Sequence, residues 1–70
     1  MKYLVLFEQS PIGWSAYVPD LPGCIATGKT KSETEQRMRE AIEFHIDGMR
    51  LDGEAVPSPT TEAEYLSIPA

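Results

Sequence analysis

The apolar residues of this 70-residue chain follow two different periods, and the change between them comes once, near Thr30. Before this point, apolar and polar positions alternate with a period of two, which is typical of β-strands. After it, apolar residues recur at helical spacings, which is typical of one face of an amphipathic helix. The chain is therefore predicted to belong to the α+β class, with a sheet that precedes a helix.

The sheet is predicted to be a three-stranded antiparallel meander. Residues 2–8 are rich in β-forming side chains and place apolar groups on both faces, which predicts a central strand covered on both sides. Residues 9–13 are expected to form a hairpin loop, residues 14–18 the return strand and residues 24–28 the third strand.

The second connection contains a Pro-Asp-Leu-Pro-Gly motif over residues 19–23. Pro22 and Gly23 suit the central positions of a type II turn, because proline fixes φ at about −65° and glycine accepts a positive φ. Asp20 is a candidate ligand or metal contact, but an Asx-type hydrogen bond that holds the turn explains the neighbouring prolines as well. We therefore predict a structural turn made by Pro19, Asp20, Pro22 and Gly23.

A helix is predicted over residues 31–52. The pair Thr30–Glu33 has the spacing of a capping box, in which the hydroxyl accepts a backbone N–H and the glutamate reaches back; the pair Ser32–Glu35 offers a second register. Gly53 is the expected C-terminal cap. The stripe that faces the sheet comprises Met38, Ala41, Ile42, His45, Ile46 and Met49.

Beyond the helix, Pro57 and Pro59 indicate an extended connector. Residues 63–68 are predicted to form a short final strand, and a helical turn that starts at Thr61 is the alternative. The expected order is β-β-β-α-β, within a single domain over residues 1–70.

One side of the predicted helix does not face the sheet. Phe44 and Leu51 lie seven residues apart on that side, so the stripe leaves both exposed beside acidic residues. An apolar strip with an acidic rim is typical of a small protein-binding surface. The alternative is that residues 65–68 fold back over the strip. The predicted partner-binding residues are Glu40, Glu43, Phe44, Asp47 and Leu51.

Charge narrows the choice of partner. The chain carries a net charge of −5, and residues 40–70 hold seven acidic residues and one basic residue, Arg50. Phosphate contacts need clustered Lys and Arg, so no direct nucleic-acid partner is expected. An acidic surface attracts a basic protein, although such a surface also serves simply to keep a small protein in solution.

A chain of this size needs support from outside its own core, because a single small core supplies only about 3–5 kcal/mol. Cys24 has no second cysteine with which to form a disulfide, and Cys24 with His45 are too few for a structural zinc site. Self-association or docking onto another protein is therefore expected, and the simplest form is a homodimer joined by paired edge strands or through the strip of Phe44 and Leu51. The sequence shows neither a targeting signal nor a membrane span, which favours the cytoplasm.

No enzymatic chemistry is predicted. His45 lies on the apolar stripe among aliphatic neighbours, and Cys24 follows a Pro-Gly turn as a small buried side chain would. Motifs for phosphate binding, metal binding or a nucleophile are absent from the sequence, and the carboxylates have no spacing that makes them converge. We expect no cofactor, no metal and no catalytic residue.

Taken together, these segments resemble the HicB-like antitoxin family. The most specific part is Val-Pro-Asp-Leu-Pro-Gly-Cys at residues 18–24, followed by Gly-Lys-Thr at residues 28–30 ahead of the helix. The resemblance extends through Ala-Ile-Glu-Phe-His-Ile at residues 41–46 to Gly-Glu-Ala-Val-Pro-Ser-Pro at residues 53–59. The order and spacing of these pieces carry the resemblance.

The resemblance implies a degraded ribonuclease-H-like fold without catalytic carboxylates. It also implies an antitoxin that binds and occludes a small basic HicA-type toxin, which cleaves mRNA. Family members commonly carry a C-terminal DNA-binding domain, and none is expected within these 70 residues. The alternative is an orphan oligomeric module that binds other proteins or a small ligand and has no cognate toxin.

Overall fold

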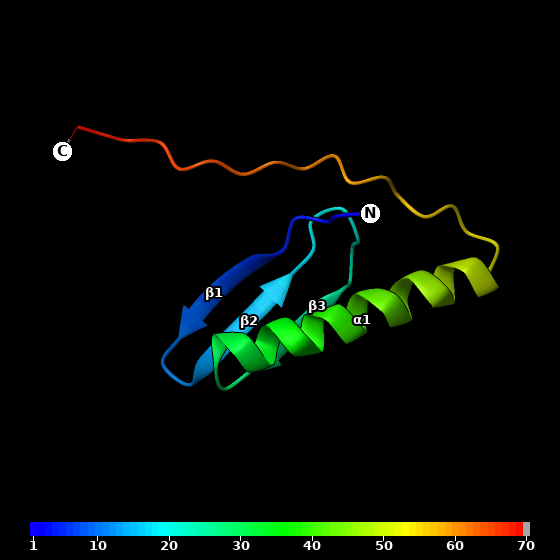
Figure 1. The fold of residues 1–70 in the computed structure, drawn as a ribbon, viewed down its shortest axis with the longest axis horizontal. Coiled ribbons are helices and arrows are strands. Elements are labelled where there is room, and N and C mark those ends of the chain that lie inside the picture. Colours follow the sequence, from blue (N-terminus) through cyan, green and yellow to red (C-terminus); the bar gives the residue numbers. More distant parts are fainter. Residues whose placement is uncertain (70) are drawn as a thin grey trace.

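A meander of three strands is followed by one long helix (Figure 1). The computed structural model describes residues 1–69, and Ala70 lies outside the described residues. The strands β1 (Leu6–Ser10), β2 (Gly13–Tyr17) and β3 (Ile25–Gly28) are antiparallel and lie in the order β1-β2-β3. The helix α1 spans Lys31–Leu51. The predicted α+β class, the antiparallel meander and the single helix are confirmed.

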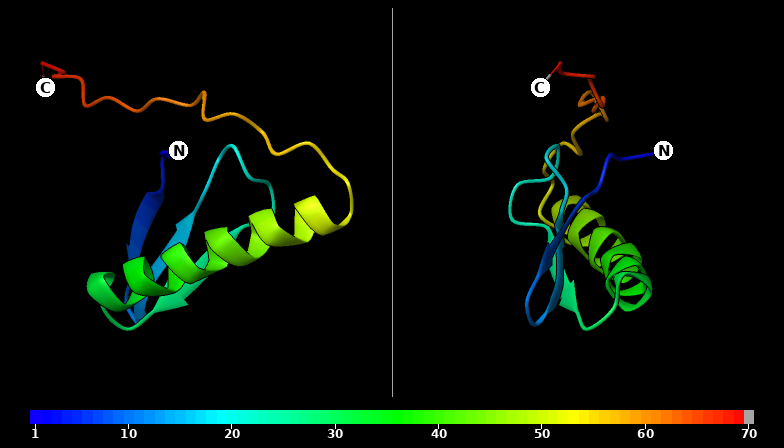
Figure 2. Two further views of the ribbon diagram at one scale, coloured as in Figure 1. Left: turned by 45° about the vertical axis from the view of Figure 1, so that its right-hand side comes forward. Right: turned by 90° about the vertical axis from the view of Figure 1, so that its left-hand side faces the viewer.

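The helix covers only one face of the sheet (Figure 2). The register places Phe7, Ala16 and Ala26 side by side on the face toward α1, and it places Leu6, Tyr17 and Ile25 on the other face. The buried core consists of Ala16, Val18, Leu21, Cys24 and Met38, with the predicted helix stripe packed against it.

The first strand was predicted to be central, and this prediction is wrong. It lies at the edge of the sheet. It is also shifted, because it spans Leu6–Ser10 where residues 2–8 were predicted. Extending the register would place Leu4 opposite Pro19, which has no N–H to donate, so pairing starts two residues later. At the other end, the predicted five-residue loop shrinks to the two residues between Ser10 and Gly13.

The Pro22-Gly23 turn forms as predicted. Gly23 has φ 84°, and the Cys24 N–H donates to the Leu21 carbonyl oxygen at 3.0 Å, which closes a type II turn. The Val18 N–H donates to the Cys24 carbonyl oxygen at 3.2 Å and closes the whole connection. The loop therefore leaves and re-enters the sheet at one place.

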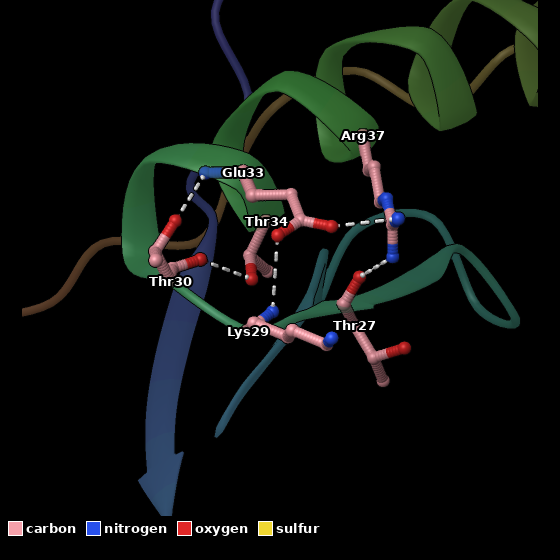
Figure 3. A network of polar contacts seen from close by, with 6 residues as sticks. All are labelled: Thr27, Lys29, Thr30, Glu33, Thr34 and Arg37. Carbon is pink, nitrogen blue, oxygen red and sulfur yellow. Dashed lines mark hydrogen bonds and ion pairs between the residues drawn. The ribbon is translucent and has the colours of Figure 1, made fainter. Parts of the chain in front are cut away.

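The capping box begins the helix at the first of its two predicted registers. The Glu33 N–H donates to Thr30 Oγ1 at 3.0 Å (Figure 3). The Glu33 carboxylate also reaches back as predicted, but it accepts from the Lys29 N–H at 3.3 Å, one residue before the N-cap Thr30 (Figure 3). The alternative cap at Ser32 is not used, because Ser32 lies inside the helix.

The same network ties the helix to the last strand. Arg37 forms an ion pair with Glu33 at 2.6 Å and donates to the Thr27 carbonyl oxygen at 3.0 Å (Figure 3). Beside it, Gly28 allows close approach, since a Cβ at this position would lie 2.5 Å from Thr34 Oγ1. A glycine here therefore lets the first turn of α1 pack directly on β3.

A Schellman motif ends the helix. Gly53 has φ 72°, its N–H donates to the Arg50 carbonyl oxygen at 3.1 Å, and the Glu54 N–H donates to the Met49 carbonyl oxygen at 2.8 Å. The predicted cap at Gly53 is confirmed, and the helix ends within one residue of the predicted boundary.

The final strand predicted over residues 63–68 does not form in the single chain, and the alternative helical turn does not form either. Residues 54–69 contain neither strand nor helix. Tyr65, Leu66 and Ile68 are exposed, and no strand of the described chain lies beside them. A β-prone segment needs a neighbouring edge to become a strand, and this segment does not reach one.

Candidate partner-binding surface

The predicted strip on the outer side of α1 is exposed. Phe44 is 82% and Leu51 is 87% exposed, whereas Met38 on the opposite side of the helix is buried. The alternative, in which residues 65–68 cover the strip, is wrong, because those residues are themselves exposed. Two large apolar side chains therefore face solvent on one side of α1.

Acidic side chains border this strip. Glu40, Glu43 and Asp47 are all exposed, and the ion pairs found within residues 1–69 leave all three unpaired. Both ion pairs lie within residues 33–39, where each acidic residue has a basic partner one turn later. The C-terminal half of α1 is therefore the acidic half, since Arg50 is the one basic residue among Glu40, Glu43 and Asp47 around Phe44 and Leu51.

An open groove of about 490 Å³ runs beside Phe44. The C-terminal half of α1, the β2–β3 loop and the start of the tail form its walls. Gly48 lies between Phe44 and Leu51 on the helix, and a Cβ there would have no described atom of another element within 4 Å. The groove is lined by Leu21, Pro22, Phe44, His45, Gly48, Met49, Asp52, Glu54 and Pro57.

Two anchors hold the tail next to this groove. The Tyr3 hydroxyl donates to the Pro57 carbonyl oxygen. The Asp20 carboxylate accepts from the backbone N–H groups of Thr60 at 2.9 Å and Thr61 at 3.0 Å. It also accepts from the Thr60 hydroxyl at 3.2 Å and the Thr61 hydroxyl at 2.6 Å. These bonds fix the path of the chain from the helix to Thr61.

Asp20 therefore has a different role from the predicted one. Its carboxylate does not hold its own turn through an Asx-type bond but binds a segment 40 residues later. The Thr61 hydroxyl and N–H, together with those of Thr60, lower the pKa of this carboxyl to about 2. No local signal marks this contact, because neither threonine has a feature that designates a distant acceptor.

The remaining candidates are not brought together. His45 is half-buried on the core side of α1, and Cys24 is buried, which raises the pKa of its thiol. Among residues 1–69, no three His, Cys, Asp or Glu side chains gather as a metal site would require. In the same part of the chain, no helix is both long and apolar enough to span a membrane.

Sequence reasoning missed the open face of the sheet. Tyr17 and Ile25 are neighbours there, and Ile25 is 67% exposed. The alternation along β2 indicates this face, because successive side chains of a strand point to opposite faces and Tyr17 follows the buried Ala16. The expectation that the sheet is covered on both sides concealed it.

The family model for the HicB-like antitoxin of bacterial toxin–antitoxin systems matches residues 3–70. This chain belongs to the HicB-like antitoxin family. An uncharacterised 14.9 kDa protein of Haemophilus phage HP1 is 39% identical over 99% of the chain, and antitoxin HicB 2 of Photorhabdus laumondii is 31% identical over the whole chain. The HicB-like chain spans about half the length of these two relatives, 52% and 51%.

Two further comparisons bear on size and fold. A UPF0150 protein of Thermoplasma acidophilum is 36% identical over 89% of the HicB-like chain, and the match covers 91% of that relative. A chain in the solved structure of the HicA3 and HicB3 toxin–antitoxin complex superposes with a TM-score of 0.73 at 28% identity. That match covers 86% of the HicB-like chain and 70% of the solved chain.

Proposed function

We propose that this HicB-like antitoxin binds and occludes a small basic toxin of the HicA type, without catalytic activity of its own. The exposed strip of Phe44 and Leu51 with its acidic rim carries the proposal. The degraded ribonuclease-H-like description of the fold belongs to the same proposal, because the meander and the helix occur in the order that it requires.

Apolar and charged groups have different tasks in such a surface. Phe44 and Leu51 provide area whose burial by a partner stabilises a complex. The unpaired acids Glu40, Glu43 and Asp47 attract a basic protein, speed its association and disfavour acidic partners. An RNA-cleaving toxin must present positive charge to bind phosphate, so an acidic helix that covers this charge would compete with RNA.

Family and fold support the same partner class. The family model describes antitoxins of toxin–antitoxin systems, and the solved chain that resembles this fold was determined in a complex of HicA3 with HicB3. A protein toxin is therefore the first partner to test.

The test is co-expression of the chain with the small basic protein encoded beside it. We expect co-purification of the two proteins and rescue of growth from the toxin. Phe44→Ala should weaken binding by about 2 kcal/mol, the scale of an exposed apolar anchor that becomes buried. The double variant Glu40→Lys and Asp47→Lys should slow association and weaken its dependence on salt.

Two control variants test whether the loss of binding is specific to the strip, because they make the same kinds of change elsewhere on the surface. Ile12→Ala removes an equally exposed apolar side chain from the hairpin, and Glu8→Lys reverses one exposed charge on the sheet. Both variants should bind as the unmodified chain does. Failure of the unmodified pair to co-purify or to rescue growth would contradict the antitoxin proposal. Full binding by Phe44→Ala and by the double charge variant would instead move the toxin site away from α1.

A stand-alone oligomeric module is the second candidate. The Thermoplasma relative favours it, because a match that covers 91% of that protein indicates a family member of similar size. A genome with no small basic reading frame beside this one would favour the module over the antitoxin.

A further inference from the structure

The last residues of the chain have the chemistry of a strand but no strand beside them. Tyr65 is fully exposed, and Leu66 and Ile68 are exposed nearly as much. The segment is extended, and its backbone forms no hydrogen bond with β1, β2 or β3. A short extended segment with exposed apolar side chains is the kind that pairs with the edge of another sheet.

The anchors at Pro57 and Thr61 direct this segment away from its own sheet. After Thr61 the chain continues past the β2–β3 loop, and its last described residues lie away from β1 in every view (Figures 1 and 2). The segment therefore projects from the molecule at a defined place. Residues 62–69 are called the C-terminal arm below.

The free edge of β1 is a suitable acceptor. As an edge strand, β1 has unpaired N–H and C=O groups along its outer side. The opposite edge is less available, because Arg37 already binds the Thr27 carbonyl oxygen on β3. An open groove of about 520 Å³ lies between β1 and α1. It is lined by Met1, Lys2, Tyr3, Val5, Phe7, Glu35, Met38, Arg39, Ile42 and Glu43.

The length of the C-terminal arm matches that of the β1 edge. The strand β1 has five residues, as does the part of the arm from Glu64 to Ile68. In the groove, Arg39 is already paired with Glu35, and Lys2 is the basic side chain that no ion pair of the described residues occupies. One alternating set of arm side chains would enter the groove, and the other would extend the open face of the sheet.

We propose that the C-terminal arm of each copy pairs with the β1 edge of a second copy, which gives an arm-exchanged homodimer. Leu66 and Ile68 lie two residues apart and therefore share the face of the arm that would enter the groove, whereas Tyr65 lies on the other face. The exchange forms this contact twice, once for each arm, as a twofold dimer requires. The exchange places β1 between β2 and the arm, which agrees with its apolar residues on both faces.

The test uses the full chain and measures its mass in solution by light scattering. The unmodified chain should be a dimer, and Leu66→Pro should raise the dimer dissociation constant by at least about tenfold, because proline removes a ladder N–H. The arm is exposed and pairs with no strand of the described chain, so Leu66→Pro should retain the helical circular dichroism signal. Ser58→Pro is the control, since it adds a proline to the connector but leaves the arm intact.

Cross-linking identifies the acceptor. A photoreactive residue at position 66 should attach to residues 1–10, and a mixture of isotope-labelled and unlabelled chains should show that the link joins two copies. A monomeric unmodified chain would overturn the proposal, and so would a dimer that survives Leu66→Pro. A dimer lost with Phe44→Glu but retained with Leu66→Pro would place the interface on α1 instead. Toxin binding is a separate readout, so either proposal can fail without the other.

Discussion

Substitution of Gly28 by alanine tests the most demanding contact of the fold. A Cβ at this position would lie 2.5 Å from Thr34 Oγ1 and 3.0 Å from the Thr34 backbone nitrogen. Thr34 has no exposed surface, and its hydroxyl donates to the Thr30 carbonyl oxygen at 2.8 Å. The added methyl group therefore either lifts the first turn of α1 from β3 or rotates the Thr34 hydroxyl out of its hydrogen bond.

The two costs combine to a large share of the total stability. Overpacking of a close contact costs about 1–3 kcal/mol, and loss of the hydrogen bond adds about 1 kcal/mol. The expected loss is about 2–4 kcal/mol, against a total of about 3–5 kcal/mol for a domain of this size. Urea unfolding monitored by the helical circular dichroism signal measures it, at one fixed chain concentration because self-association shifts apparent stability.

Gly48→Ala is the matched control. This glycine lies inside α1 with open space where the Cβ would be, so the same substitution should stabilise the chain by about 1 kcal/mol. Combining Gly28→Ala with Thr34→Ala should cost less than the two separate losses together, because the second change removes the nearest clashing atom. Equal stability of Gly28→Ala and the unmodified chain would refute the close-packing argument.

Two further predictions concern Asp20 and Cys24. The folded pKa of Asp20 is about 2, below its ordinary 3.8, so the anchor on Thr60 and Thr61 should be complete above about pH 4 and be lost as the pH falls through 2. The amide chemical shift of Thr61 reports this titration; a midpoint near 3.8, or no change with Asp20→Asn at neutral pH, would contradict the anchor. The Cys24 thiol, buried and with a raised pKa, should react with a thiol reagent far more slowly than in urea, and equal rates would disprove its burial.

Features whose partners are close in sequence were predictable. The Thr30–Glu33 cap, the Pro22-Gly23 turn and the Gly53 cap each satisfy backbone groups within a few residues. Their side chains and backbone preferences specify the local structure almost independently of the rest of the chain. The predicted helix boundaries therefore differ from the observed ones by one residue at most.

Features that depend on distant partners were not predictable. The hydrogen bonds of Asp20 join it to Thr60 and Thr61. The sequence does not distinguish these two residues from several other polar residues that could also bind a carboxylate. Likewise, the β-forming character of residues 63–68 says nothing about which edge is within reach. The exposed strip was predictable only in part, because helix geometry places Phe44 and Leu51 on the outer side but does not show whether the tail covers them.

The acidic rim also bears on which surface joins two copies of the chain. In a dimer formed through the helix strip, the acidic rim of one copy would lie against the acidic rim of the other, because a twofold interface joins the same surface of both copies. Juxtaposed like charges disfavour such an interface, whereas a basic partner gains from the same charges. Two copies are therefore better joined through the C-terminal arm and the β1 edge, because the free edge of β1 lies outside this acidic rim. This arrangement leaves Phe44 and Leu51 free for the toxin, so charge on one half of one helix separates self-association from partner binding.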